Sequence, residues 1–427
     1  MAGAENAAVK PDERSPLHLI PESFHTGEIM KKNNGLLILI LAVGVFGILN
    51  TEMGVIGILP LVATMFGVSI TRAALLVSGF ALVIALSAPV LPLLFSGFDR
   101  KKVMLLSLAV FVVSNIISVF ATDFDIILAA RLIPAAFHPV YVSLAFTVAA
   151  ESVEKTEAPK AVARVFIGVS AGLVLGVPMT SLIATESSFA FAMTFFAVVN
   201  MAVLAATAIW MPAMPVREKQ GYGTQLRVLG KPGLWIAIII SILLNGSVFG
   251  FFSYMADYLN VVTGMGARTI SLMLLVFGLA NIAGNIVAGK TLSTHPDRTV
   301  VAVPFILSAL FLLMSVTGNW GSATAALILP FGILAGIVAN ANQYLISDSA
   351  TEAPMFANGL YLTAQNLGIT AGSALCGFFI SVWGTQYTLA GSILMLLPAI
   401  LFIFIRLFVT RKRYDTRSFS DKQECCQ

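Results

Sequence analysis

The chain has 427 residues, of which 58% are hydrophobic and 11% are charged. A soluble domain carries roughly 25% charged residues to meet water, so this composition excludes a soluble globular protein and indicates that lipid surrounds most of the surface. The net charge of +4 comes from Lys and Arg in short polar segments without a basic domain, and we therefore expect no nucleic-acid partner. The three Cys residues show no disulfide or metal spacing, and we expect no metal site.

The chain begins with a polar stretch, residues 1–34, that has no cleavable signal peptide and that we interpret as a cytoplasmic tail. A bilayer core of about 30 Å requires roughly 20 apolar residues per helix. Twelve stretches meet this requirement, and they begin near Gly35, Arg72, Val103, Phe124, Val162, Phe189, Gly233, Arg268, Thr299, Gly321, Ala357 and Gln386. The sequence therefore predicts an all-α membrane protein with twelve transmembrane helices, which we call spans one to twelve.

The longest internal polar break, from Pro212 to Pro232, separates the spans into two groups of six. We expect a six-helix bundle in residues 35–211, a cytoplasmic linker in 212–232, a second bundle in 233–408 and a cytoplasmic tail in 409–427. With the N-terminus inside, 22 of the 25 Lys and Arg residues lie on the cytoplasmic side. This asymmetry predicts a multi-pass protein of the bacterial cytoplasmic membrane with both termini in the cytoplasm.

The two groups of spans also resemble each other at a nearly constant offset of 196 to 200 residues, which predicts two pseudo-symmetric bundles with a binding site between them. The matching features are two glycines in spans five and eleven, an Asp-Arg pair after spans two and eight, and an Arg at the start of spans two and eight: Gly168 and Gly172 with Gly368 and Gly372, Asp99 and Arg100 with Asp297 and Arg298, and Arg72 with Arg268.

Ionisable side chains within spans are costly and indicate function. Glu52 lies about seventeen residues into span one, where a carboxyl group partly removed from water is a candidate to bind and release a proton. The alternative is a Glu that is hydrogen-bonded between helices and never titrates.

Span four contains Arg131 and His138, which are seven residues apart and so lie on one helix face about 10 Å apart. Arg131 keeps its charge in a membrane and must face a cavity, a carboxylate or main-chain carbonyls. We expect it to pair with Glu52. His138 is a candidate proton relay or substrate ligand, and its alternative role is a neutral His bonded to a neighbouring helix.

Small residues recur every four positions in two spans, a pattern that allows helix backbones to approach closely in lipid. In span five they are Gly168, Gly172 and Gly176, followed by Pro178, and in span eight they are Ala280, Gly284 and Ala288. We expect span five to pack on span eight as a seam between the bundles. Ordinary helix packing is the alternative.

Neutral polar side chains within spans need partners and should face the bundle interior. A cavity lined by amides and aromatic rings suits a neutral, hydroxyl-bearing or amphipathic solute, although helix-to-helix hydrogen bonds would explain many of them. The candidates for substrate binding, besides His138, are Asn50, Asn245, Tyr254, Asn340, Gln343, Tyr361, Gln365 and Asn366. Asp257, Asp348 and Glu352 are expected to be solvated charges at span ends, the last two beside basic inner loops.

Several of these segments resemble motifs of the major facilitator superfamily, and the similarity runs from about Gly35 to Phe408. The chain resembles the twelve-helix drug:proton antiporter type, in the arabinose-efflux-permease-like branch that includes sugar, purine-nucleoside and chloramphenicol exporters. The segments that carry the resemblance are Thr51–Met53 with Gly57–Pro60, Ala130–His138, Gly168–Pro178, Phe277–Gly278 with Gly284–Asn285 and Gly289, and Gln365–Gly368.

Two positions depart from the family pattern. The loop after span two, Gly97–Lys102, is contracted relative to the family's loop. Asp257 stands where the family would have an apolar residue or Pro. The resemblance implies that Asp99, Arg100 and Lys101 stabilise one gate state from the inner side. Because the loop is contracted, the family's gating role is less secure for these residues.

We interpret the chain as a proton-driven transporter, not an enzyme, that exports a small organic solute by alternating access, with protons and lipid as its other partners and no cofactor. Glu52 carries the proton, with Arg131 as its charge partner and His138 as relay or ligand. A monomer is implied by the resemblance. The alternatives are an importer of the same fold, a lipid or glycolipid flippase, and a non-transporting receptor or scaffold.

Overall fold

The computed structural model describes residues 34–154, 157–214 and 225–424. Within these ranges every regular element is helical, and twelve helices are long and apolar enough to cross a membrane. Each begins within three residues of its expected start, so the predicted all-α, twelve-span membrane fold is confirmed. Most of the predicted N-terminal tail and the Cys425–Cys426 pair lie outside the described residues.

The first six spans, which we call the N-half, contain several helix breaks. Span one consists of α2, η1 and α3, span two of α4 and α5, and span five of α9, η2 and α10, whereas spans three, four and six are single helices. The bounds are α2 (Asn34–Met53), η1 (Gly54–Ile58), α3 (Leu59–Phe66), α4 (Ile70–Ala73), α5 (Leu75–Ser87), α6 (Leu91–Leu94), α7 (Arg100–Phe120), α8 (Phe124–Glu151), α9 (Ala158–Ala171), η2 (Gly172–Gly176), α10 (Val177–Glu186) and α11 (Phe189–Trp210).

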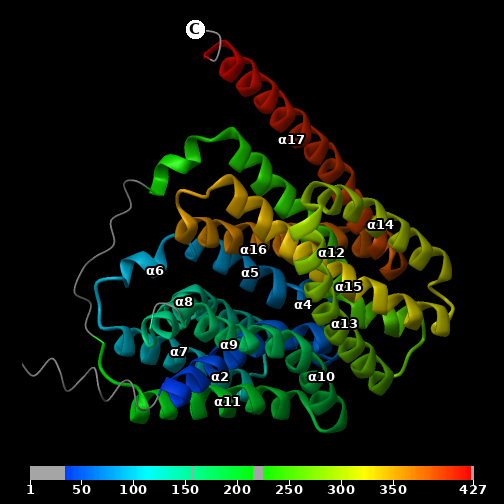
Figure 1. Ribbon diagram of the computed structural model, residues 1–427. Helices are drawn as coiled ribbons and strands as arrows, with labels where there is room; N and C mark the ends of the chain where they lie inside the picture. Colours follow the sequence, from blue (N-terminus) through cyan, green and yellow to red (C-terminus); the bar gives the residue numbers. More distant parts are fainter. Residues whose placement is uncertain (1–33, 155–156, 215–224, 425–427) are drawn as a thin grey trace, which may run out of the picture.

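The last six spans, the C-half, are longer and more regular. After η3 they are α12, α13, α14, α15, α16 and, following η4, α17. The bounds are η3 (Gln225–Gly230), α12 (Pro232–Val261), α13 (Ala267–Thr294), α14 (Pro296–Thr317), α15 (Gly321–Ser349), α16 (Pro354–Trp383), η4 (Thr385–Tyr387) and α17 (Thr388–Glu424). The segment expected to be a tail after residue 408 continues α17 as a helix that projects beyond the bundle (Figure 1).

Short polar caps end and restart the helices between spans. Asp99 caps α7 by accepting a hydrogen bond from the Lys102 N–H, Asp123 caps α8, and Ser188 caps α11. Such side chains satisfy the free N–H groups of a first helical turn. Each of these caps begins a new span after a short loop, and the chain reverses direction there.

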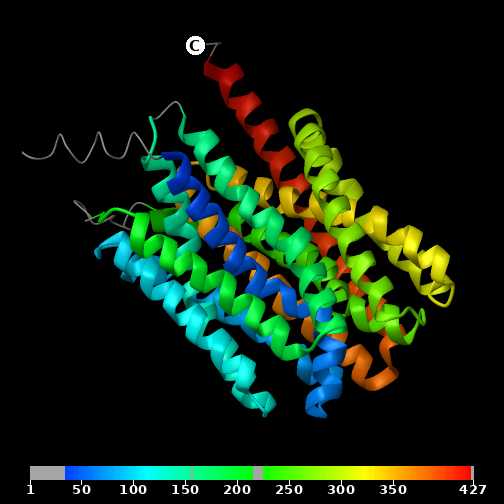
Figure 2. The same ribbon diagram turned by 90° about the horizontal axis from the view of Figure 1, so that it is seen from below.

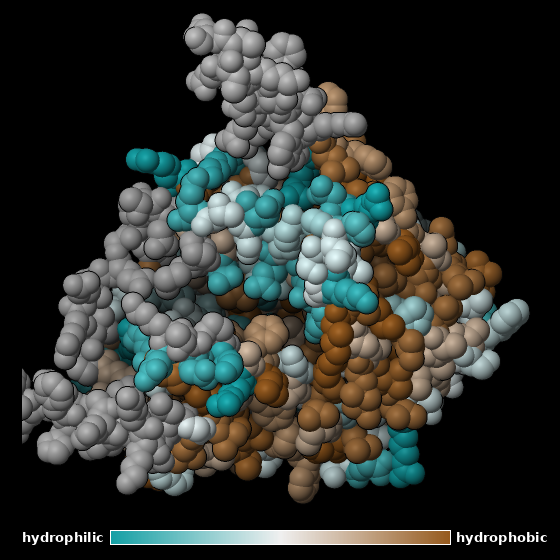
Figure 3. Space-filling model, viewed as in Figure 1, coloured by the Kyte–Doolittle hydropathy of each residue, from teal (hydrophilic) through white to brown (hydrophobic). Residues whose placement is uncertain are grey.

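The long helices run alongside one another, with the C-half above the N-half in Figure 1, and Figure 2 shows the same bundle from below. Within the halves, α12 packs on α16, α13 on α15, α7 on α11 and α2 on α9, while α5–α16 and α10–α13 join the halves. Figure 3 shows hydrophobic residues over the right and lower parts of one face and hydrophilic residues toward its upper left and centre. The apolar part provides the surface that lipid requires.

The two glycine repeats make equivalent contacts in the two halves. A Cβ on Gly168 would clash with the carbonyl of Ala42 in α2, and a Cβ on Gly368 would stand 2.8 Å from the carbonyl of Ile242 in α12. Ala42 and Ile242 are themselves 200 residues apart. The repeat therefore reflects one packing solution used twice, between the first and fifth helix of each half.

Span five does pack on span eight, as expected, because η2 and α10 contact α13. The small-residue stripes, however, do not form that contact. Gly168, Gly172 and Gly176 face α2, where a Cβ would meet Ala42, Leu49 and Asn50 respectively. Gly284 of span eight faces the carbonyl of Ile333 in α15. Both stripes pack inside their own half, where small residues allow α9 and η2 to approach α2 closely and α13 to approach α15 closely.

Candidate functional site

The ionisable cluster of the N-half forms where span one changes its helix type. Glu52 is in the last turn of α2, directly before the 3-10 helix η1, and its residue is 6% exposed. His138 projects from α8 and is 4% exposed. A mid-helix 3-10 segment often marks a functional hinge, and the two buried side chains meet beside this one.

Glu52 and His138 are in direct contact. His138 Nε2 lies 2.9 Å from Glu52 Oε2. The distance is that of an ion pair, but the ring N–H is not aligned on the carboxylate well enough to form a hydrogen bond. Among the described residues, His138 Nδ1 is also buried without a hydrogen-bond partner. The arrangement places an acid and a base within reach of one proton, away from water.

Arg131 does not pair with the Glu52 carboxylate as expected. Its buried Nη2 donates to the carbonyls of Thr51 at 2.9 Å and Glu52 at 3.1 Å, and its Nε donates to the carbonyl of Leu76 at 3.4 Å. The backbone leaves the α-helical pattern at Gly54, so the carbonyls just before it are open to an outside donor. Main-chain oxygens of α2 and α5 therefore accept from Nη2 and Nε, whereas Nη1 is buried without a hydrogen-bond partner.

Phe80 of α5 joins the same cluster and was not predicted from the sequence. The Arg131 guanidinium carbon lies 5.2 Å from the centroid of the Phe80 ring, and the His138 ring meets Phe80 edge-on at 6.5 Å. A cation over an aromatic face is attracted by the ring quadrupole. No signal in the sequence distinguishes Phe80 among 30 Phe residues.

The polar side chains beside Glu52 form hydrogen bonds with one another. Asn200 Nδ2 of α11 donates to Thr51 Oγ1 at 3.0 Å, and Asn115 of α7 lies within 3.4 Å of the same oxygen. Asn50, a predicted substrate ligand, is fully buried and lies against Gly176. Amides within spans three and six were the available signal for Asn115 and Asn200, and the sequence interpretation missed it.

Span five is irregular at the same level as Glu52. Residues Gly172–Gly176 form a π-helical turn, η2, which ends two residues before Pro178. Pro178 has no N–H to donate to the carbonyl four residues earlier, and its ring crowds that turn. Because η2 packs on α2, two non-α segments lie together around Asn50.

Four of the predicted C-half substrate residues come together. Asn245 Nδ2 donates to the carbonyl of Gln365 at 2.7 Å, and Gln365 Nε2 donates to the Tyr361 hydroxyl at 2.5 Å. That hydroxyl lies 3.4 Å from the carbonyl of Ala339, next to Asn340. Thus α12, α15 and α16 contribute to one polar cluster, and Asn340 extends it by donating to Asn285 of α13 at 2.7 Å.

The other three predicted C-half ligands lie apart from that cluster. Asn366 donates to the carbonyl of Leu362 in its own helix at 2.9 Å, and Gln343 is exposed. Tyr254 is buried and donates to the carbonyl of Ser373 at 3.1 Å, which joins α12 to α16. These contacts fit helix packing.

The basic residues after span two act within the N-half. Asp99 Oδ2 accepts from the N–H of Met214 at 3.0 Å, Lys101 Nζ donates to the carbonyl of Ala208 at 2.8 Å, and Arg100 pairs with Glu151. In the C-half the corresponding level carries the pairs Arg406–Asp348 and Lys231–Glu352, each at 2.9 Å. We call this level the basic end of the bundle, and the other level the distal end.

Asp257 differs from its expected solvated position. It is 7% exposed and accepts a hydrogen bond from Thr385 Oγ1 at 2.9 Å. The reason is that α12 continues to Val261, so Asp257 is still inside the helix where η4 packs against it.

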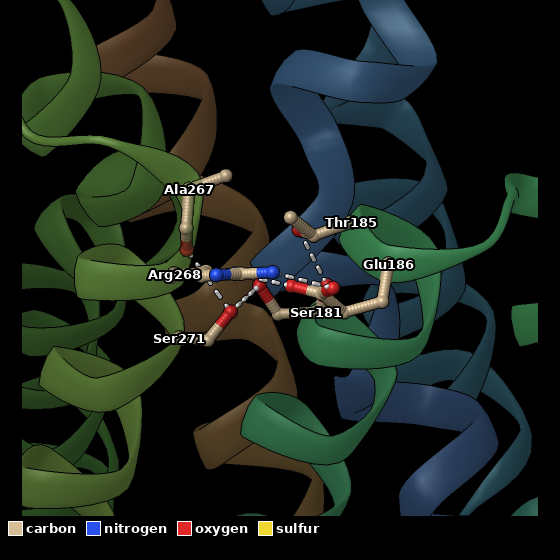
Figure 4. A network of polar contacts seen from close by, with 6 residues as sticks. All are labelled: Ser181, Thr185, Glu186, Ala267, Arg268 and Ser271. Atoms are coloured by element: carbon tan, nitrogen blue, oxygen red, sulfur yellow. Dashed lines mark hydrogen bonds and ion pairs between the residues drawn. The ribbon is translucent and has the colours of Figure 1, made fainter.

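The halves contact each other toward the distal end. Ser181 and Ser271 approach to 2.8 Å between α10 and α13, and Arg268 pairs with Glu186 (Figure 4). Between α16 and α5, Thr370 Oγ1 donates to the carbonyl of Ser78. In the described ranges, the recorded ion pairs of the basic end stay within one half. The same ranges contain no group of three or more His, Cys, Asp or Glu side chains that could hold a metal ion.

Comparison with known proteins matches residues 41–267 and 234–424 to the family model of the Major Facilitator Superfamily. The chain is 29% identical to the uncharacterized MFS-type transporter YtbD of Bacillus subtilis (strain 168), over 90% of this chain and 98% of that protein. It is 27% identical to the putative transporter AraJ of Escherichia coli (strain K12), covering 86% and 92%. It is 26% identical to a chloramphenicol resistance protein of Streptomyces lividans, covering 78% and 86%.

Among solved structures, a mutant of the nucleoside transporter NupG has a TM-score of 0.72 at 13% identity, over 88% of this chain and 99% of that one. A bacterial homologue of the human lysosomal transporter Spinster, in an inward-facing and unoccupied conformation, has a TM-score of 0.67 at 15% identity, covering 88% and 97%. Both likenesses concern the fold.

Proposed function

Because the chain belongs to the major facilitator superfamily, it is a secondary transporter, and we propose that it exports a small organic solute in exchange for protons. The observation that carries the proposal is the buried contact between Glu52 and His138. A charged side chain inside a membrane protein is costly unless it is paired or functional. This pair can hold or release one proton without exposing a charge to lipid.

Arg131 supports the proton role through its fixed position. Its hydrogen bonds hold a permanent positive charge at the α2–η1 junction, on the main chain of Glu52 itself. When Glu52 is ionised and His138 is neutral, the cluster has no net charge. An added proton makes it positive. Loading therefore changes the electrostatic energy at the junction, and η1 transmits the change to α10 and α12, which it contacts.

The orientation and boundaries belong to the same proposal. The basic end faces the cytoplasm with both termini, by the distribution of Lys and Arg. The half-to-half contacts then lie at the outer side, which supports an inward-open state. Residues 35–211 and 233–408 move as the two bundles, residues 212–232 link them, and the protein acts as a monomer. Asp99, Arg100 and Lys101 hold the inner end of the N-half during that movement.

The substrate class follows from the C-half cluster. Asn245, Asn340, Tyr361 and Gln365 present amides and a hydroxyl, without a charged group among them. Such side chains suit a neutral, hydroxyl-bearing solute. The relatives include a chloramphenicol resistance protein and a probable sugar efflux transporter, and both names fit this chemistry.

The test uses proteoliposomes with an interior pH dye and a panel of a sugar, a nucleoside, chloramphenicol and a cationic dye. One member of the panel should evoke proton movement in the wild type, and Glu52→Gln should abolish it. Asp125→Asn is the matched control, since it removes an exposed carboxylate of the same half. Solute movement with unchanged proton movement in Glu52→Gln would contradict the coupling. Proton movement evoked only by the cationic dye, or by none of the four, would contradict the neutral substrate class.

A further inference from the structure

The seam between span five (η2 and α10) and α13 joins the halves at three successive levels (Figure 4 shows the outer two). Nearest the middle, a Cβ on Gly278 would stand 2.7 Å from the Cα of Val174. Next, the Ser181 and Ser271 hydroxyls are 2.8 Å apart, and both residues are buried.

At the distal end of this seam, Arg268 donates two parallel hydrogen bonds to Glu186. Nε donates to Oε1 at 2.6 Å and Nη2 donates to Oε2 at 2.9 Å. A bidentate Arg–carboxylate pair adds geometric specificity to charge attraction. The side chains are 77% and 40% exposed, so the ion pair is open to the medium above a buried hydroxyl contact.

The pseudo-symmetry of the chain is broken at this ion pair. Arg72, the counterpart of Arg268 in the N-half, pairs with Asp125 of its own half at 2.8 Å. The positions that match Asp125 in the C-half, residues 321–325, contain no acidic residue, so Arg268 has no such partner within its half. The position that matches Glu186 is Gln386, which has no charge to offer Arg72.

Among the ion pairs of the described residues, Glu186–Arg268 differs from the others because it joins the two halves. Those lie within one half and persist whichever way the halves tilt. An interaction shifts a conformational equilibrium only when it differs between the two states. Opening the distal end separates α10 from α13, and the contacts of this seam are then lost.

We propose that Glu186 and Arg268, with Ser181 and Ser271 beneath them, form a latch that closes the distal end and biases the resting protein toward the state open at the basic end. The latch rests on the alternating-access part of the proposed function, but not on proton coupling or on the identity of the solute. Exposed ion pairs are weak, so removing the charges should raise the ratio of distal-open to distal-closed protein about two- to five-fold.

The test measures a distance across the distal end by pulsed electron paramagnetic resonance. Spin labels are placed at Phe120 and Val316, exposed residues at the distal ends of α7 and α14, in a background where Cys425 and Cys426 are Ser. Cys376 is buried and stays unlabelled. The long-distance fraction reports the distal-open state without substrate or a proton gradient, so its result is independent of the export test.

Glu186→Gln and Arg268→Gln should each increase the long-distance fraction, and the exchanged pair Glu186→Arg with Arg268→Glu should restore it. Arg72→Gln is the matched control, because it removes the equivalent ion pair within one half, and it should leave the fraction unchanged. Equal fractions in all variants, or an increase in Arg72→Gln as large as in Arg268→Gln, would overturn the latch.

A salt titration of the wild type tests the same point without any variant at the seam. Raising NaCl from 0.05 to 1 M shortens the screening length from well over 10 Å to about 3 Å and weakens exposed ion pairs. The long-distance fraction should rise with salt in the wild type and in Arg72→Gln, but not in Arg268→Gln. The same salt response in all three proteins would contradict the proposal.

Discussion

Replacement of Arg131 by Lys separates the charge of this side chain from its geometry. Arg131 donates to carbonyls of two helices, Thr51 and Glu52 in α2 and Leu76 in α5. A Lys ammonium is a single point and cannot reproduce the fork that reaches both helices. Arg131→Lys therefore keeps the charge and loses at least one charge-assisted hydrogen bond.

The lost hydrogen bond sets the expected magnitude. A hydrogen bond to a charged group contributes about 1.5–3 kcal/mol, and the carbonyl left behind is buried. For a unit the size of one half, a loss of about 2 kcal/mol corresponds to a decrease in melting temperature on the order of 5 °C. Arg131→Met removes the charge as well, so it should also abolish solute-evoked proton movement.

The assay pairs thermal unfolding in detergent with proton movement in proteoliposomes. Arg131→Lys should melt several degrees below the wild type and retain reduced proton movement. If Arg131→Lys matched the wild type in both measurements, the carbonyl contacts would not hold the α2–η1 junction. If Arg131→Met retained proton movement, the fixed charge would have no part in coupling.

Three further predictions concern other parts of the fold. Gly168→Leu should destabilise the N-half by about 1–3 kcal/mol or more, because its side chain would enter the α2 backbone, whereas Gly289→Ala, with no atom within 4 Å of the added Cβ, should leave the melting temperature unchanged. Asp257→Asn should preserve stability, since an amide oxygen can still accept from Thr385, while Asp257→Leu should lower it by about 1 kcal/mol, and equal melting curves for the two would refute that role. His138→Gln should flatten the pH dependence of transport, because a Gln side chain cannot bind the proton that an imidazole can, and an unchanged pH profile would show that His138 is structural.

The span positions were predictable because lipid constrains each crossing to a length and a composition. Polar or small residues between apolar stretches revealed the breaks before Val103, Phe189 and Gly321, and the helices begin at these residues or within three residues of them. The internal repeat was visible for the same reason, since Gly168 and Gly368 satisfy the same close approach.

Partners in space were not predictable from spacing along the chain. A glycine stripe indicates that some helix comes close, but nothing in it identifies α2 rather than α13. Arg131 was expected to pair with the carboxylate of Glu52, but it donates to main-chain carbonyls that a local change of helix type leaves free. Arg268 and Glu186 are 82 residues apart, and their pairing depends on the tilt of two halves.

Solute counterflow compared with pH-driven transport tests the coupling most directly. Counterflow exchanges labelled for unlabelled solute without net proton movement, so it requires alternating access but no proton step. In Glu52→Gln, counterflow should continue near the wild-type rate, while accumulation driven by a pH gradient should be lost. If Glu52→Gln still accumulated solute in response to a pH gradient, the buried contact between Glu52 and His138 would not be the proton site.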